Sequence, residues 1–367
     1  MSDVRISQFQ VAISIAAVSI GTVFFPIAAV VVPLAGAAGW LAVLLAFVSA
    51  APWVLMAVSL VRRSPVGDWG QTTRAWLGPW LSRAFLLYFA FIWAWLGGML
   101  LANGALVFHN MALPRTPPAV LAFAILFLVV MVDIRGVEVY VRTVEALSMV
   151  AVPLLVSFFV VAIGSAKLKN LQPLFGEAPI RIVHAAYLVS PWVMEGILFA
   201  MFAGAHLRVR TRLGTISLVA FAIGGLTLAM TTAVTLGVLG RDVTESYVYP
   251  TVVLSQVAQI GFFLQGLEIF LYPLWLLASF VKVGACFLLV SESVKGIWSG
   301  AKQPYRALLV GALFYFINTL PNTVSEAGAF ISRVDNTFFM AFYGIIPLLW
   351  LWVKLSGRGE QQKHAEG

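Results

Sequence analysis

Three charged residues lie within long apolar runs of the chain, and their chemistry most needs an explanation. Glu195 and Glu268 carry carboxylates, and Lys282 carries an ammonium. A charge at the centre of a membrane helix costs at least about 2.5–3.5 kcal/mol unless it faces protein or water. These side chains are therefore candidates for contact with a ligand, an ion or another buried charge.

Each of these charges has alternative roles. Glu195 either holds a ligand ammonium or ties two helices together as a buried carboxylate. Lys282 lies 14 residues after Glu268, on the same helix face but about 21 Å further along the axis, so the two cannot pair directly. Lys282 then either binds a carbonyl at a break in the first span, in place of a metal cation, or extends to the cytoplasmic face. For Glu268, nearer the outer end of its span, gating, structural hydrogen bonding and ligand contact all stay open.

Catalytic and metal-binding patterns do not occur in the sequence. It has no His-Glu-x-x-His, no Gly-x-Ser-x-Gly and no phosphate-binding P-loop. The histidines fall at span edges or in tails, Cys286 is the single cysteine, and Asp133 is the only Asp that we place near a span. We predict no catalytic residue, no bound metal and no cofactor, and thus a protein that is not an enzyme.

The composition determines the environment of these residues. Of 367 residues, 61% are hydrophobic and 10% are charged, with a mean hydropathy of +0.96. A soluble domain carries about 25% charged residues, so we predict an all-α integral membrane protein in contact with lipid. At roughly 20 residues per span, there is room for about ten spans. The apolar segments are 9–33, 37–61, 82–108, 118–133, 143–165, 185–205, 213–239, 256–290, 305–321 and 336–353.

The distribution of positive charge predicts the orientation. With a cytoplasmic N-terminus, 16 of the 23 Lys and Arg residues fall in inner segments and 6 in outer ones, while Lys282 lies in a span. Inner loops of membrane proteins carry this excess. We therefore expect both termini, including a tail over 355–367, to be cytoplasmic. The net charge of +8 is then a sign of topology, and we predict no nucleic-acid partner.

A polar segment, Lys167–His184, divides the single membrane domain 1–367 into two halves, 8–165 and 185–354. Each half holds five predicted spans. Because five is odd, the second half must enter the membrane from the opposite side, which indicates an inverted repeat. The first span of each half also contains helix-breaking residues at its middle, at Gly21–Pro26 and at Ser190–Gly196. We therefore predict that helices 1 and 6 are both discontinuous.

Paired breaks of this kind predict a binding site at mid-membrane. Backbone freed from helical pairing must be satisfied by protein, water or ligand, and the N-terminal ends of half-helices suit a carboxylate. With Glu195 for an ammonium and apolar neighbours, the site fits a small neutral amino acid. We predict gating or coupling roles for Glu268 and Lys282. The predicted substrate-binding residues are Gly21, Thr22, Phe24, Ser190, Trp192, Glu195 and Gly196.

Several segments resemble the spore-germination permease family, within the amino acid–polyamine–organocation transporter superfamily. The resemblance extends from Ile6 to about Leu355. One departure is Gly266, where family members often carry an Arg shortly before the equivalent of Glu268. The segments that carry the resemblance are Gly21–Pro26 with Gly39-Trp40, Arg115-Thr116-Pro117, Lys169–Glu177, the break at Glu195, Tyr249-Pro250-Thr251, and Leu267–Phe270 with Trp275.

The resemblance implies a fold like that of LeuT, with ten helices in two inverted five-helix repeats. It also implies a function: the membrane subunit of a spore germinant receptor, which binds a small germinant such as an amino acid. Such a subunit would lie in the spore inner membrane or the cell membrane, with a larger receptor subunit and a lipoprotein subunit as partners. The alternative, a proton- or ion-coupled amino acid secondary transporter, uses the same broken-helix site and stays open.

Overall fold

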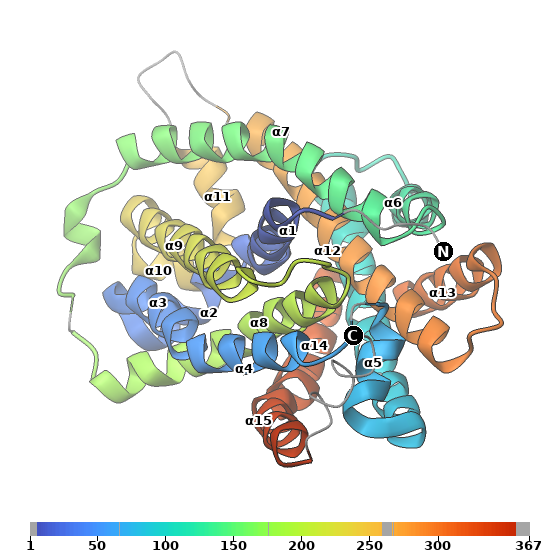
Figure 1. Ribbon diagram of the computed structural model, residues 1–367. Coiled ribbons are helices and arrows are strands. Elements are labelled where there is room, and N and C mark those ends of the chain that lie inside the picture. Colours follow the sequence, from blue (N-terminus) through green and yellow to red (C-terminus); the bar gives the residue numbers. More distant parts are fainter. Residues whose placement is uncertain (1–5, 66, 175, 259–265, 267, 357–367) are drawn as a thin grey trace.

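The chain forms a bundle of helices in a computed structural model that describes residues 6–65, 67–174, 176–258, 266 and 268–356 (Figure 1). Those ranges contain no strand. The helical segments are α1 Gln8–Ile20, η1 Gly21–Phe24, α2 Ile27–Ala35, η2 Gly36–Ala38, α3 Gly39–Ser49, α4 Ala51–Arg62, α5 Trp69–Met111, α6 Pro118–Asp133, α7 Val137–Gly164, η3 Leu168–Leu171, α8 Pro179–Ala205, α9 Leu213–Leu239, α10 Arg241–Ser246, α11 Pro250–Val257, α12 Glu268–Ile297, α13 Gln303–Asn318, α14 Val324–Val334, η4 Asp335–Phe339 and α15 Met340–Leu355.

Seven helical runs are long and apolar enough to cross a bilayer, which needs about 20 residues. The α1–η1 segment and α6 are apolar but shorter. The predicted all-α membrane protein is thus confirmed, while the count of ten spans and the two inverted repeats stay predictions. The seven runs are Ile27–Arg62, Trp69–Met111, Val137–Gly164, Pro179–Ala205, Leu213–Leu239, Glu268–Ile297 and Val324–Leu355.

Helix α1 lies in the interior of the bundle, where α7, α8, α9 and α12 all pack against it (Figure 1). It ends at Gly21, whose φ of +22° is unfavourable for residues with a Cβ. The chain then forms the short turn η1, and α2 starts only after Pro26. The predicted break in the first span is therefore confirmed.

The predicted break in the sixth span is wrong, because α8 is one continuous helix from Pro179 to Ala205. Pro191 removes one backbone donor inside it, but membrane helices tolerate this when neighbouring groups bind the freed backbone. The carbonyl that Pro191 leaves without its helical donor is that of Tyr187, four residues earlier. Beside the proline, Tyr343 of α15 donates a hydrogen bond to the Ser190 carbonyl at 3.0 Å, which joins α8 to α15. Gly196 does not unwind the helix; it lets α1 approach, since a Cβ there would lie 2.4 Å from Ser19 Oγ.

Helices α5 and α12 pack closely along their lengths, and small residues make this possible. A Cβ on Gly97 would lie 2.7 Å from the Cβ of Cys286 on α12 and 2.2 Å from the Phe314 ring on α13. A Cβ on Gly98 would lie 2.5 Å from Ile317. These contacts hold the middle of α12, which carries Lys282, in a fixed position.

The predicted apolar segment 256–290 is not one continuous helix in the part of the chain that the structure describes, and its residues 259–265 and 267 lie outside that part. Helix α11 ends at Val257, and α12 begins at Glu268. Glu268 therefore lies at the first residue of a helix and is half-buried, rather than inside a span as predicted. A carboxylate at a helix N-terminus is stabilised by the helix dipole and needs no buried partner.

Candidate functional site

The central feature of the molecule is a buried ion pair between α8 and α12. The Lys282 ammonium pairs with Glu195 Oε2 and donates a hydrogen bond to the Val18 carbonyl at 3.0 Å. Both charged side chains are only 1% exposed. Lys282 therefore does not extend to the membrane surface; it binds a carbonyl beside the break in the first span, which is one of the two predicted alternatives.

The break in α1 makes this contact possible. Val18 lies in the last turn of α1, whose helical hydrogen bonding ends at Gly21. Gly21 lies directly against the lysine stem, since a Cβ on Gly21 would be 3.3 Å from Lys282 Cδ. Three elements, α1, α8 and α12, thus meet at one ammonium.

A second buried carboxylate near the ion pair, Asp335, is not among the site residues predicted from the sequence. It is 3% exposed and begins the π-helical turn η4 between α14 and α15. Trp192 Nε1 donates to its Oδ2 at 2.9 Å, and its Oδ1 has no hydrogen-bond partner in the described part of the chain. Asp133 is therefore not the only Asp near a span. The signal was available, because Asp335 directly precedes the predicted span 336–353.

A cavity of about 250 Å³ lies beside this ion pair. Glu195 and Lys282 contribute to its wall, and Trp192 extends the polar part of the wall towards Asp335. The size suits a small molecule with several polar groups. The lining residues are Thr22, Val23, Pro26, Ala29, Val30, Leu96, Leu100, Asn103, Trp192, Glu195, Val248, Tyr249, Lys282, Val324, Ser325, Gly328, Ile331 and Ser332.

Aromatic contacts connect one wall of the cavity to the break in the first helix. Asn103 and Tyr249 exchange hydrogen bonds of 2.7 and 3.0 Å. The Tyr249 ring contacts Trp275 edge-on, and Trp275 stacks on Phe25 with ring centroids 3.9 Å apart. Tyr249 in the cavity wall is therefore connected through Trp275 to the segment between α1 and α2.

The predicted site residues occupy different positions. Thr22, Trp192 and Glu195 line the cavity, together with Lys282. Gly21 and Phe24 instead line a separate apolar groove.

Two other predicted residues have structural contacts. Ser190 donates a hydrogen bond to the Ala186 carbonyl, and Gly196 faces Ser19. The contact of any of these residues with a ligand stays a prediction.

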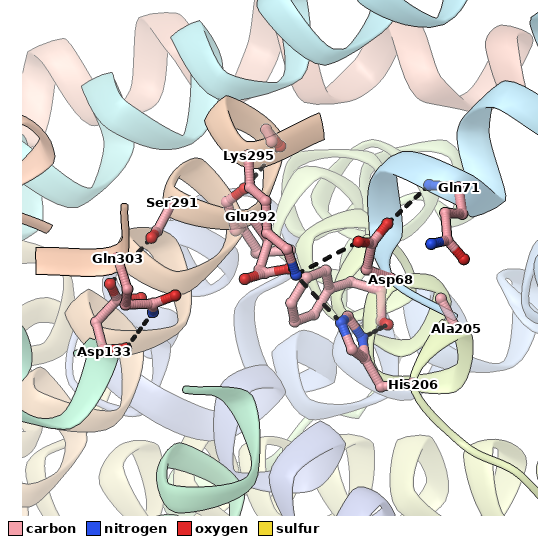
Figure 2. Close-up of polar contacts among 12 residues, drawn as sticks. Asp68, Gln71, Asp133, Ala205, His206, Ser291, Glu292, Lys295 and Gln303 are labelled. Carbon is pink, nitrogen blue, oxygen red and sulfur yellow. Dashed lines mark hydrogen bonds and ion pairs between the residues drawn. The ribbon is translucent and has the colours of Figure 1, made fainter. Parts of the chain in front are cut away.

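A polar network holds the helix ends on the side where α1 begins, which we call the N-side (Figure 2). Lys295 Nζ lies 3.0 Å from Glu292 and 3.4 Å from Asp68 of the α5 N-cap. His206, at the end of α8, lies 3.9 Å from Glu292, and Arg306 of α13 reaches the same carboxylate at 3.4 Å. The network joins the C-terminal ends of α8 and α12 to the N-terminal ends of α5 and α13.

Arg210 adds further hydrogen bonds between helix ends on the N-side. Its guanidinium donates to the carbonyls of Val61 at 2.6 Å, Ser64 at 2.9 Å and Ala205 at 2.6 Å. Burial lowers the pKa of Arg210 to about 10, so it stays charged at neutral pH. It fixes the loop after α4 to the loop after α8.

On the opposite side of the molecule, Glu177 connects α8 to α10. It accepts hydrogen bonds from Arg241 at 2.7 Å and from Arg181 at 2.5 Å. Arg241 also reaches Glu245 at 2.6 Å and the Pro33 carbonyl of α2 at 3.4 Å. The hydrogen bond from Arg241 is the main reason that the pKa of Glu177 lies below its ordinary value.

A helical membrane bundle with a broken central helix and a ligand-sized cavity at a buried ion pair defines a protein of the permease type. The sequence matches the model of a family described as spore germination protein, over residues 3–327. It is also 26% identical, over 306 residues, to spore germination protein KB of Bacillus subtilis (strain 168), a match that covers 80% of this chain and 78% of that protein. The chain therefore belongs to the spore germination permease family, as its motifs predicted.

Proposed function

We propose that this protein is the membrane subunit of a germinant receptor and that it binds a small zwitterionic amino acid in the central cavity. The observation that carries the proposal is the pair of opposite charges, Glu195 and Lys282, in the wall of a cavity of about 250 Å³. A zwitterion presents the same two charges. Its ammonium would contact Glu195 and its carboxylate Lys282, so the buried charges stay compensated when the ligand separates them.

The apolar part of the lining supports an amino acid with a small uncharged side chain. Leu96, Leu100 and Ile331 surround the polar wall, and a charged side chain among them would be desolvated without a partner. We propose that ligand binding shifts the equilibrium between two conformations of the α1–α2 break. A larger receptor subunit and a lipoprotein subunit would detect this shift in the spore inner membrane.

Two glycines allow a sharp test of the cavity. A Cβ at Gly328 or at Gly344 would meet no atom within 4 Å, but only Gly328 lines the cavity. Gly328→Leu should abolish the heat of alanine or valine binding in calorimetry on purified protein, without lowering the melting temperature. Gly344→Leu should change neither.

Two results would contradict the proposal. One is unchanged amino acid binding in Gly328→Leu. The other is a wild-type protein that releases no heat with neutral amino acids but binds a sugar or a nucleoside.

A second candidate function is proton- or ion-coupled transport of the amino acid. The observation that favours it is the Lys282 ammonium on the Val18 carbonyl, because a fixed cation beside a helix break can take the place of a coupling ion. Uptake of labelled alanine into proteoliposomes, with and without a proton gradient, distinguishes the two functions. A transporter accumulates alanine with the gradient, whereas a receptor binds it without uptake.

A further inference from the structure

A second hollow lies on the surface of the bundle and is separate from the central cavity. It is a groove of about 920 Å³ between α1, α7 and α9, with residues of α12 in its wall. Most of its lining is apolar, and several lining side chains are exposed, such as Phe9 at 65% and Met149 at 70%. In a bilayer, an open apolar surface of this kind faces acyl chains.

The length of the groove matches one leaflet. It extends along α1 from Gln8 to the break at Gly21, a rise of about 20 Å. Half of a bilayer core is about 15 Å thick. An acyl chain that enters on the N-side therefore reaches the break at the centre of the molecule.

The groove carries two opposite charges among its lining residues. Arg212, the N-cap residue of α9, is exposed, and its guanidinium has no partner among the described residues. Glu145 of α7 is half-buried, and its Oε2 accepts a hydrogen bond from Gln10 at 2.8 Å, while its Oε1 has no partner in the same ranges. Arg142, three residues before Glu145, pairs with Glu138 on the same helix.

We propose that this groove binds a phospholipid of the phosphatidylethanolamine type from the N-side leaflet. The phosphate contacts Arg212 and the primary ammonium contacts Glu145, so one headgroup satisfies both charges. One acyl chain fills the groove and ends against Gly21 and Phe25. A phosphatidylglycerol headgroup carries the same phosphate but no ammonium, so it would leave Glu145 without a cation.

Because the acyl chain ends at Gly21, the lipid can influence the ion pair of Glu195 and Lys282. Gly21 separates the groove from Lys282, since a Cβ built on Gly21 would lie 3.3 Å from Lys282 Cδ. The acyl chain thus packs against the backbone of the break, whose other face touches the lysine stem. Occupancy of the groove stabilises the break in the conformation described here.

Native mass spectrometry of the purified protein tests this proposal. The probe is an equal mixture of dioleoyl phosphatidylethanolamine, phosphatidylcholine and phosphatidylglycerol. Wild type should retain the phosphatidylethanolamine preferentially. Arg212→Gln should lower its retention by about tenfold, the effect of one charge-assisted hydrogen bond. Glu145→Gln should remove the preference over phosphatidylcholine, and Arg83→Gln, an exposed arginine stacked on Trp80 outside the groove, should change nothing.

A groove-filling variant tests independently whether an acyl chain occupies the groove. Ala16→Phe places a ring in the groove and should lower retention of all three lipids, whereas Ala119→Phe, on an exposed position of α6, should not. If Ala16→Phe does not fold, Arg212→Gln and Glu145→Gln still test whether the groove binds the lipid headgroup. Unchanged retention in both Arg212→Gln and Glu145→Gln, or preferential retention of phosphatidylglycerol by wild type, would overturn the proposal.

Discussion

Glu195 and Lys282 neutralise each other inside the protein, and this changes what a mutation of either residue should do. From the sequence, Glu195 was either a ligand contact or a buried carboxylate that ties two helices together, and Lys282 either bound a carbonyl at the first-span break or extended to the cytoplasmic face. In the structure they form one pair, 1% exposed on each side. Removing one partner of a buried pair leaves an uncompensated charge, which is strongly destabilising, whereas removing both is far less so.

We therefore predict that Glu195→Gln and Lys282→Met each lower the free energy of unfolding by about 3–5 kcal/mol. The double variant should recover most of this loss, because no buried charge is left. Thermal denaturation of the four proteins in one detergent measures the coupling. Losses that simply add in the double variant would mean that the pair does not act as a unit.

Ligand affinity gives a separate prediction for Glu195. If the carboxylate binds the ammonium of an amino acid, Glu195→Gln should weaken binding by about 10- to 100-fold, the effect of a hydrogen bond to a charged group. Because the substitution also affects folding, affinity is measured at a temperature where the variant is fully folded. An unchanged dissociation constant would restrict Glu195 to a structural role.

Gly21 gives the clearest steric prediction. A side chain there needs a strained φ of +22° and meets Lys282 within 3.3 Å, so it must displace the lysine stem. Gly21→Leu should abolish the ligand response while the protein still inserts into the membrane. The response is measured as germination of spores that carry the variant; Gly344→Leu, where the added side chain has free space, is the matched control.

At the scale of elements, Arg210 is the residue that holds the N-side loops. It donates to the carbonyls of Val61 and Ser64 at the end of α4 and of Ala205 at the end of α8. Val61 keeps its hydrogen bonds from Ser64, but the other two carbonyls lose the Arg210 donor, and each buried carbonyl left without a donor costs about 1–3 kcal/mol. Arg210→Met should therefore destabilise the protein by at least about 2 kcal/mol. Arg210→Lys should recover only part of this, because an ammonium cannot reach all three acceptors. Arg83→Met, at an exposed position, should leave the melting temperature unchanged.

The link between α8 and α10 should make stability depend on pH. The pKa of Glu177 is lower in the folded protein, chiefly because Arg241 donates a hydrogen bond to it. Its contribution to stability is then complete above the ordinary glutamate pKa and is lost as the pH falls through the lower folded value. Melting temperatures of wild type and Glu177→Gln should differ at pH 7 and start to converge only as the pH falls below the ordinary glutamate pKa of about 4.3. Asp242→Asn, an exposed neighbour, should show no such convergence.

At the scale of the whole molecule, the excess of Lys and Arg on one side predicts that the N-side is cytoplasmic. Because the single cysteine, Cys286, is buried, engineered cysteines can report topology. Ser356→Cys should react with an impermeant maleimide only after the membrane is opened, and Leu168→Cys, in a strongly exposed position, should react in intact cells. The reverse pattern of labelling would show that the N-side faces the outside of the cell.

The sequence by itself determined the features that depend on composition and local chemistry. An apolar content of 61% required a membrane helix bundle, because a chain with so little polar surface cannot be solvated. The Gly21–Pro26 break followed from local backbone chemistry, since a glycine with positive φ and a proline both end helices. The motifs identified the family for the same reason: they lie within short stretches of chain.

Only the tertiary structure decided which charges meet. Glu195 and Lys282 are 87 residues apart in the sequence, and nothing local pairs them; close packing of α8, α1 and α12 does. Asp335 became part of the same region only because η4 buries it next to Trp192. The structure also shows that α8 continues through Pro191, and that Gly196 lies against Ser19 of α1 instead of breaking the helix. Contacts between distant segments depend on how whole helices pack, and that information is not local to any motif.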